Sequence, residues 1–373
     1  MQVVQRAGAH LLLVCLVLVG LGLVMIYSAS SELARVRFED SSFFLKRQSV
    51  RAALGLVAMF ALSRVPLMWW ARLSRFLMLA AIFFLVLVLF FGTGPAQRWL
   101  PMPSFLAGFN FQPSEFAKLA LVLYLADVLV RKEGDLQEFK KGLLPRLVVV
   151  GLVLVLIAAQ PDLGTSIAVG AIALVLLWVG GVQPLQLGGV LLVGAIGVSI
   201  SLFSSSYQMA RLTNFINGSG ESAGNYQITQ SLIGMGSGGL FGVGLGNSMQ
   251  KLQYLPEPHT DFVFSFVGEE LGLAGTLSVI GLFIAFAIHG QRIAREASDS
   301  YGFLVATGIT AMVSIYALLN IGVVTGALPT TGLPLPFVSY GGSSLLWNMA
   351  GVGILMGVAR HSAAELSAQG RRH

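Results

Sequence analysis

The sequence predicts an all-α, polytopic membrane protein of about ten transmembrane helices. Of its 373 residues, 55% are hydrophobic and only 11% are charged, whereas about 25% of the residues in a soluble domain carry charge. Apolar runs near the length that crosses a bilayer, about 20 residues, recur along the whole chain. The 44 glycines suit helices that pack closely in lipid.

Ten apolar runs are the candidate spans. The first, with small residues at Tyr27–Ser30, has features of a cleaved signal peptide, but the many later spans favour a retained helix. The second run is weakly apolar, and the short fifth run is separated from the sixth only by the tight turn Pro161–Gly164. The expected spans are 10–29, 49–64, 75–92, 114–130, 146–160, 164–181, 185–204, 263–289, 303–325 and 343–359.

The Lys and Arg residues orient these helices, because cytoplasmic loops carry an excess of both. With the N-terminus inside, most basic residues fall on the inner side, and both termini are expected to be cytoplasmic. The first outer stretch opposes the rule with five basic residues, Arg35, Arg37, Lys46, Arg47 and Arg51.

The residues 1–373 are expected to form a single transmembrane domain whose longest loop, 205–262, is extracytoplasmic and follows the seventh span. Loops of this length are usually functional, and Tyr226–Ile233 is expected to form a short surface helix within it. The net charge of +6 is attributed to topology and membrane lipids rather than to nucleic acid. The single Cys15 excludes an internal disulfide and has no metal-ligand spacing.

Charged residues beside apolar spans are the first candidates for a functional site. Asp261 lies where the long loop enters the eighth span, and it is interpreted either as a helix cap or as a general base at the mouth of a cavity. His259 and Thr260, just before it, are assigned to substrate binding.

Glu115 and Lys118 are spaced to share one helix face. They form either an ion pair near the interface, with Lys118 extending outward, or a pair that presents a cation to substrate. Asp162, in the tight outer turn, either caps the next helix or joins the site. Arg98 is a candidate phosphate ligand and Trp99 a membrane anchor, both assigned to substrate binding.

Two further motifs have plainer interpretations. The run Gly234–Gly246 contains G-x-G-x-x-G but follows no strand, so it is interpreted as a flexible loop and tight packing. Glu269 and Glu270 point in different directions, which favours polar contacts over catalysis. Residues 328–344 mix apolar residues with Pro and Gly, so a re-entrant segment lining a cavity is expected there, with Ser339 as a substrate ligand.

Together these segments resemble the SEDS family of membrane glycosyltransferases, which includes RodA and FtsW. Within the family, Gly246–Leu252 and Gly341–Ser344 are more similar to FtsW than to RodA, and a sporulation-type relative stays open. The resemblance covers nearly the whole chain, and its motifs are Phe111–Lys118, Gln160–Gly164, Tyr226–Ser231, Leu255–Gly272 and Gly332–Ser344.

The resemblance implies a glycosyltransferase that polymerises lipid II, the undecaprenyl-pyrophosphate-linked disaccharide-pentapeptide, on the outer face of the cytoplasmic membrane. It implies that Asp261 is essential and that Glu115, Lys118 and Asp162 face one central cavity. It also implies a class B penicillin-binding protein as the transpeptidase partner, other divisome membrane proteins, and a place at the division septum.

The chemistry of that reaction agrees with these residues. Pyrophosphate is a good leaving group, so it needs cations rather than the second carboxyl group of a glycosidase. We expect Asp261 to deprotonate the acceptor hydroxyl, which attacks the anomeric carbon with inversion. Lys118, Arg98, and Lys251 or a divalent cation (Mg²⁺ or Mn²⁺) would stabilise the pyrophosphate; the identity of each cation stays open.

Three alternatives remain: a lipid II flippase, a RodA-type elongation polymerase and a non-catalytic scaffold. A flippase needs polar residues through the bilayer midplane, but the charged candidates fall near the outer face. A scaffold has no need of Asp261, Glu115 and Lys118 in apolar surroundings. The polymerase is therefore favoured.

Overall fold

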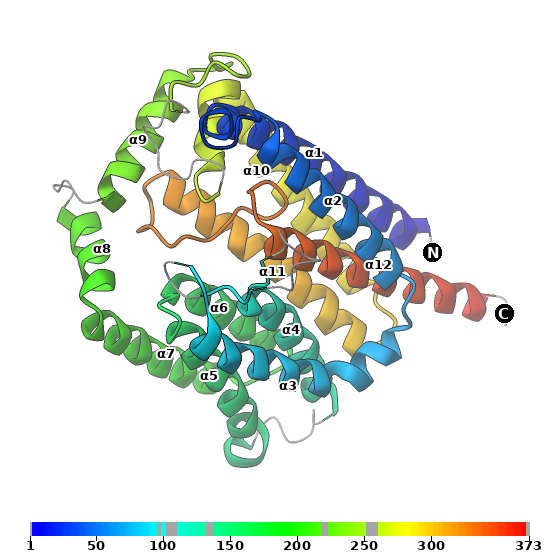
Figure 1. Ribbon diagram of the computed structural model, residues 1–373. Coiled ribbons are helices and arrows are strands. Elements are labelled where there is room, and N and C mark those ends of the chain that lie inside the picture. The colour runs from blue at the N-terminus through cyan, green and yellow to red at the C-terminus, as the bar shows by residue number, and fades with distance from the viewer. Residues whose placement is uncertain are drawn as a thin grey trace.

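The computed structural model describes residues 2–94, 98–101, 110–131, 138–217, 223–250 and 260–370. Helices make up most of this part of the chain (Figure 1), and its only bridge pairings join Thr93 to Trp99 and Leu100 to Phe111. The helices are α1 (Gln2–Phe38), α2 (Phe43–Leu62), α3 (Leu67–Phe91), α4 (Pro113–Arg131), the π-helical turn η3 (Phe139–Leu143), α5 (Leu144–Ala158), α6 (Leu163–Val179), α7 (Pro184–Ser204), α8 (Ser206–Asn217), α9 (Ala223–Ser237), α10 (Val263–Arg295), α11 (Ser300–Val324) and α12 (Gly342–Gly370).

Each predicted span corresponds to one helix among α1–α7 and α10–α12, which confirms the all-α membrane fold. Of the described helices, seven are long and apolar enough to cross a bilayer on these criteria alone. The other three are α2, α4 and α6. Most of α4 is buried by its neighbours, so this helix can carry charged residues that a lipid-facing helix could not.

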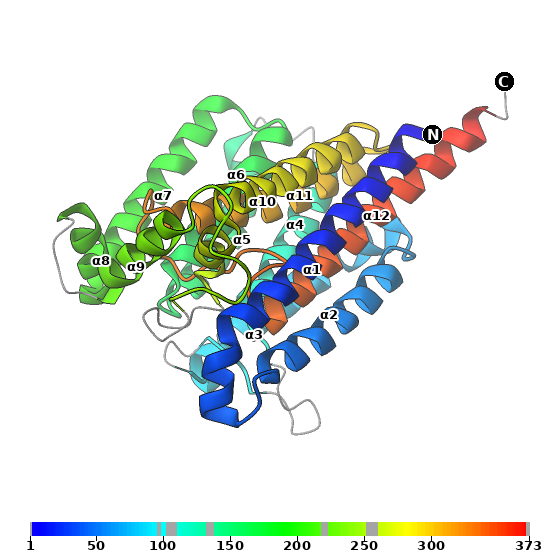
Figure 2. The same cartoon turned by 90° about the horizontal axis from the view of Figure 1, so that it is seen from above.

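Both termini lie at the same end of the molecule (Figures 1 and 2), as predicted. The assignment of that end to the cytoplasm stays a prediction. α1, α2, α10 and α12 run side by side on one side of the bundle (Figure 2), and α4, α6 and α11 pack against one another in its centre.

The basic stretch between α1 and α2 has local partners. Four of its five cations pair with a nearby acid or lie over an aromatic ring. These contacts are Arg35 to Glu32 at 2.9 Å, Lys46 to Asp40 at 2.8 Å, Arg47 over Phe43 at 4.3 Å and Arg51 over Tyr340 at 4.7 Å.

The long loop is more ordered than the sequence suggested. The helix expected at 226–233 is present as the longer α9, but α8 was not predicted. α8 follows α7 after a single residue, Ser205, where the helical backbone is interrupted. Figure 1 shows α7, α8 and α9 along one edge of the molecule, and α7 buries none of its residues.

α10 is broken near its start, at Gly272, whose φ of 67° is left-handed. The break exposes peptide groups that cannot bond within the helix, and the glycine-rich run predicted to pack tightly satisfies them. It is therefore an ordered structural element rather than a flexible loop. The bonds join Val243 N to Glu269 O (3.0 Å), Gly244 N to Glu270 O (3.1 Å), Leu273 N to Gly239 O (2.9 Å) and Ala274 N to Leu240 O (3.0 Å).

The side chains beside this break make polar contacts, as predicted for the two adjacent acids. Glu269 accepts from Ser248 Oγ and from Met249 N (2.7 Å), whereas Glu270 accepts from Ser28 Oγ of α1 (2.5 Å). The two carboxylates therefore face different elements and tie both of them to α10.

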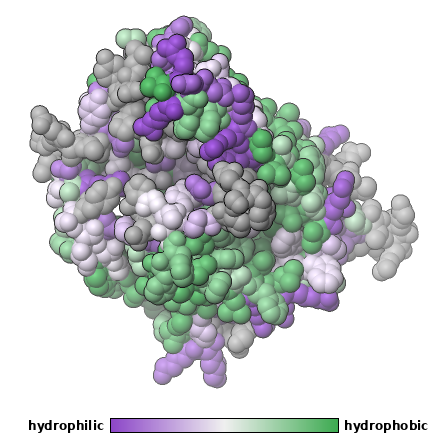
Figure 3. Space-filling view, in the orientation of Figure 1, coloured by the Kyte–Doolittle hydropathy of each residue, from purple (hydrophilic) through white to green (hydrophobic). Residues whose placement is uncertain are grey.

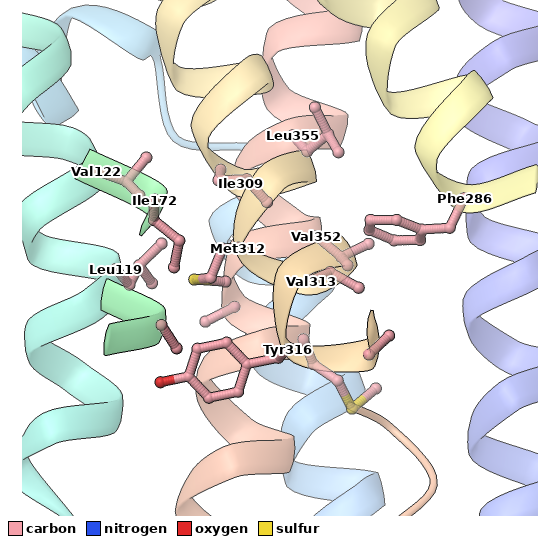
Figure 4. Close-up of a cluster of buried hydrophobic side chains, with 14 of the residues drawn as sticks. Leu119, Val122, Ile172, Phe286, Ile309, Met312, Val313, Tyr316, Val352 and Leu355 are labelled. Atoms are coloured by element: carbon pink, nitrogen blue, oxygen red, sulfur yellow. The ribbon is translucent and has the colours of Figure 1, made fainter. Parts of the chain in front are cut away.

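The middle of the bundle is apolar. Figure 4 shows a cluster contributed by α4, α6, α10, α11 and α12, in which every labelled side chain is at most 3% exposed. Its labelled members are Leu119, Val122, Ile172, Phe286, Ile309, Met312, Val313, Tyr316, Val352 and Leu355.

The break in α10 leads to a prediction. Gly272→Ala forces a left-handed residue to carry a Cβ that collides with the backbone of Gly242, so the free energy of unfolding should fall by at least about 1–3 kcal/mol. The matched control is Gly281→Ala in the same helix, where a Cβ meets nothing within 4 Å. Unfolding by SDS in mixed micelles measures both, and equal effects would contradict the proposed role of the break.

Candidate active site

The start of α4 carries a buried ion pair. Pro113 begins the helix, where its missing N–H costs nothing. Lys118 Nζ lies 2.6 Å from Glu115 Oε2, and the two side chains are 0% and 2% exposed. The predicted pair is present, but the alternative in which Lys118 extends to the interface is wrong. The contact lacks the direction of a hydrogen bond, and no acceptor in the described part of the chain is aligned with Lys118 Nζ.

An aromatic ring forms the other side of this cation. Lys118 Nζ lies 4.0 Å from the centroid of Tyr316 on α11, a cation–π contact that is strongest when shielded from water. Figure 4 shows the Tyr316 hydroxyl directed toward the side of α4 and α6. There the charges of Glu115 and Asp162 act on it.

The turn between α5 and α6 positions a second buried carboxylate. Asp162 caps α6 by accepting from Thr165 N at 3.2 Å, and it also pairs with Arg98 NH1 at 3.3 Å. Arg98 donates to Pro161 O at 2.9 Å, which holds the guanidinium on the turn. Burial raises the pKa of Asp162, and Arg98 opposes that shift. The capping and charge-pairing roles therefore coexist.

The predicted re-entrant segment lies between α11 and α12 and is fastened to Asp261. Asn320 of α11, 1% exposed, donates through Nδ2 to Asp261 O and to Leu333 O, both at 2.7 Å. Asp261 is half-buried in the turn that precedes α10, so its side chain reaches solvent while its backbone is fixed.

The same segment joins Asp261 to the Asp162 turn. A Cβ placed on Gly332 would lie 3.4 Å from Asp261 Oδ2, and one on Gly164 would lie 2.9 Å from Thr331 O. Thr331 and Gly332 are adjacent, so the Asp261 carboxylate and the start of α6 flank one short stretch of chain. Arg211 of α8 donates to Thr330 O at 3.3 Å, which brings a further cation to this stretch.

The remaining predicted site residues are less central or lie outside the described residues. Ser339 Oγ accepts from Leu335 N at 2.9 Å, a bond that holds the segment's own turn. Trp99 pairs with Thr93 in a small hairpin. Thr260 immediately precedes Asp261 and is half-buried. Lys251 and His259 lie outside the described residues.

Two contacts of this site were missed by the sequence analysis. Tyr316 and Asn320 are one helical turn apart in the largely apolar α11, and both are buried. A polar residue inside an apolar span is itself a signal for function, and it could have marked Asn320.

The site combines three carboxylates with cations at the ends of several helices. Glu115 is paired with Lys118 and Asp162 with Arg98, whereas Asp261 lies half-buried in the turn before α10. Within the described ranges, no group of three or more His, Cys, Asp or Glu residues is placed to hold a metal. This arrangement can remove a proton at one position and bind negative charge at another.

The comparisons with known proteins agree on one family. The family model described as "Cell cycle protein", for FtsW, RodA and SpoVE, matches residues 9–364. Stage V sporulation protein E of Bacillus subtilis (strain 168) is 42% identical over 94% of this chain and 96% of its own length. The probable peptidoglycan glycosyltransferase FtsW of Geobacter sp. (strain M18) is 39% identical over 96% of this chain and 98% of its own length.

Solved structures share the fold. A solved structure aligns with this chain with a TM-score of 0.78 and 28% identity. It is described as showing the structural coordination of polymerization and crosslinking by a peptidoglycan synthase complex. It covers 94% of this chain and 97% of that one. The crystal structure of the rod shape determining protein RodA of Thermus thermophilus aligns with a TM-score of 0.69 and 30% identity. This alignment covers 94% of this chain and 95% of the RodA chain.

The buried ion pair leads to a second prediction. Lys118→Met leaves Glu115 buried without its counter-charge, which should cost about 3–5 kcal/mol of stability. The double variant Glu115→Gln/Lys118→Met removes both charges and should regain most of that loss. SDS unfolding of the wild type, Lys118→Met, Glu115→Gln and the double variant gives the coupling energy between the two charges. Additive effects would show that the two charges act independently.

Proposed function

The chain belongs to the family of FtsW, RodA and SpoVE, and on that basis we propose that it is a peptidoglycan glycosyltransferase. It polymerises lipid II into glycan strands at the outer face of the cytoplasmic membrane. The observation that carries this proposal is the half-buried carboxylate of Asp261, which shares one short stretch of the re-entrant segment with the start of α6 and its Asp162–Arg98 pair.

Asp261 acts as the general base. Its carboxylate takes the proton of the acceptor sugar hydroxyl, and the hydroxyl oxygen forms a bond to the donor's anomeric carbon. The bond from that carbon to the pyrophosphate oxygen breaks, the configuration inverts, and the lipid pyrophosphate leaves. The half-buried position of Asp261 supports this role, because the side chain reaches both the site and the solvent that finally accepts the proton.

Lys118 and Arg98 bind the pyrophosphate. Glu115 and the ring of Tyr316 fix the fully buried ammonium group of Lys118 in place, so the surrounding side chains must move aside before phosphate oxygens reach it. A preorganised cation away from water stabilises developing negative charge without rearrangement during the reaction. Arg98 lies on the Asp162 turn at the edge of the same site.

A metal ion is not needed by this scheme, and the described side chains offer no complete set of ligands for one. Mg²⁺ or Mn²⁺ held mainly by the substrate's phosphates and by one carboxylate is compatible with the site. In that case the ion would add to the charge stabilisation that Lys118 and Arg98 provide.

The partner is proposed to be a class B penicillin-binding protein that supplies the transpeptidase. The alignment with a peptidoglycan synthase complex supports this assignment. The relatives named FtsW support a role at the division septum, alongside other divisome membrane proteins. The relative Stage V sporulation protein E keeps a sporulation role as the second candidate, and an elongation role of the RodA type is the third.

A flippase is less well supported. Its polar substrate would have to cross the middle of the bundle, where α4, α6, α11 and α12 meet in the apolar cluster of Figure 4. Chemistry at one end of the molecule needs no such path.

The proposal predicts the behaviour of Asp261→Asn. Loss of a general base lowers rates by about 100-fold to 10,000-fold, so polymer formation from labelled lipid II should fall by at least about 100-fold. The control is Asp40→Asn, which removes a carboxyl group that is paired with Lys46 in the α1–α2 loop. Gel analysis of the product, with the partner transpeptidase present, measures both. Wild-type polymer yield from Asp261→Asn would refute the base assignment.

A further inference from the structure

A cavity of about 410 Å³ lies between α3, the second half of α4 and the start of α5. Tyr124 of α4 lines it, nine residues beyond Glu115, which places it about 13 Å along the helix from the candidate active site. In the predicted topology this is the inner half of the membrane, so the cavity is separate from the site described above.

Among the residues that the structure describes, cations line this cavity and acids do not. Arg75, Lys141 and Arg146 are among its lining residues, which include no Asp or Glu. Arg146 is 1% exposed, and its guanidinium donates to the carbonyl oxygens of Gly142 and Val128, which fixes it between α4 and α5.

The other two cations, Arg75 and Lys141, form only weak ion pairs. Arg75 Nε is 3.8 Å from Asp127, whose carboxylate is held more closely by Arg131 at 2.6 Å. Lys141 is 77% exposed and pairs at 3.2 Å with Glu138, which is 63% exposed, and exposed pairs of this kind are weak. Both cations can therefore turn toward an anion in the cavity.

The rest of the wall is apolar. Met78, Leu79, Ile82 and Val149 line the cavity, and Ile82 lies about 10 Å beyond Arg75 along α3, toward the membrane interior. Figure 3 shows that the surface over this part of the molecule is largely hydrophobic. The cavity is thus cationic at one end and apolar along its length.

We propose that this cavity binds an acidic phospholipid of the inner leaflet. The phosphate lies against Arg75, Lys141 and Arg146, and an acyl chain follows Met78 and Ile82 along the apolar wall. Basic pockets between transmembrane helices on the cytoplasmic side bind anionic headgroups in this way. A zwitterionic lipid of the same chain length lacks the net charge that the three cations recognise.

Native mass spectrometry of the purified chain tests the proposal with three probes: phosphatidylglycerol, phosphatidylcholine with identical chains, and inorganic phosphate. Because each cation contributes about 1 kcal/mol to anionic lipid binding, Arg75→Gln/Lys141→Gln should weaken phosphatidylglycerol binding roughly thirtyfold. The matched control, Arg6→Gln/Arg292→Gln, removes two exposed cations from α1 and α10 and should leave binding unchanged.

A second variant separates a lipid from a free anion. Ile82→Trp fills the apolar part of the cavity without changing charge, and it should weaken phosphatidylglycerol binding while leaving the cations intact. Inorganic phosphate that competes as strongly as phosphatidylglycerol would assign the site to a free anion and overturn the lipid. Two results would overturn the site itself: phosphatidylcholine binding as tightly as phosphatidylglycerol, or Arg6→Gln/Arg292→Gln weakening phosphatidylglycerol binding as much as Arg75→Gln/Lys141→Gln.

Discussion

The structure depends on one constraint: the irregular backbone between α11 and α12 must satisfy its hydrogen bonds inside the protein. Lipid offers no partners for peptide groups, so such a segment persists only against protein or a water-filled cavity. Here Asn320 bonds Leu333 O, Ser339 bonds Leu335 N, and Gln48 of α2 reaches Ser339 O at 3.4 Å. Helices from opposite ends of the sequence therefore meet around one segment.

The candidate active site follows from that arrangement. The segment presses against α1, where a Cβ on Gly22 would lie 2.7 Å from Phe337 O, and it holds Phe337 at a φ of 67°. A bulky residue in that region is strained, so the surrounding packing determines the path of the chain. The path brings Thr331 and Gly332 between Asp261 and the start of α6. Asp261 and the start of α6, which lie far apart in the sequence, thus meet because a single non-helical segment touches both.

The sequence predicted the parts of this structure that depend on local pattern. Ten apolar runs became ten helices, and the spacing of Glu115 and Lys118 placed them together on one face. What it could not predict depends on contacts between distant residues. Lys118 was open to two interpretations until the ring of Tyr316, on another helix, was found over it. The break in α10 depends on backbone bonds to a loop about 30 residues earlier, and no local signal at Gly272 distinguishes it from the glycines that only aid packing.

The central claim is that Asn320 fastens the Asp261 turn to the re-entrant segment, and hydrogen–deuterium exchange tests it most directly. In the wild type, the amides of Leu328, Leu335, Val338 and Ser339 should exchange slowly although they lie outside the helices, because their N–H groups donate to Gly322 O, Ser339 Oγ and Leu335 O. In Asn320→Leu, the amides of residues 260–262 and 331–335 should exchange faster together, while the amides of α11 stay protected. Rapid exchange of the segment in the wild type, or an unchanged Asp261 turn in Asn320→Leu, would contradict the account.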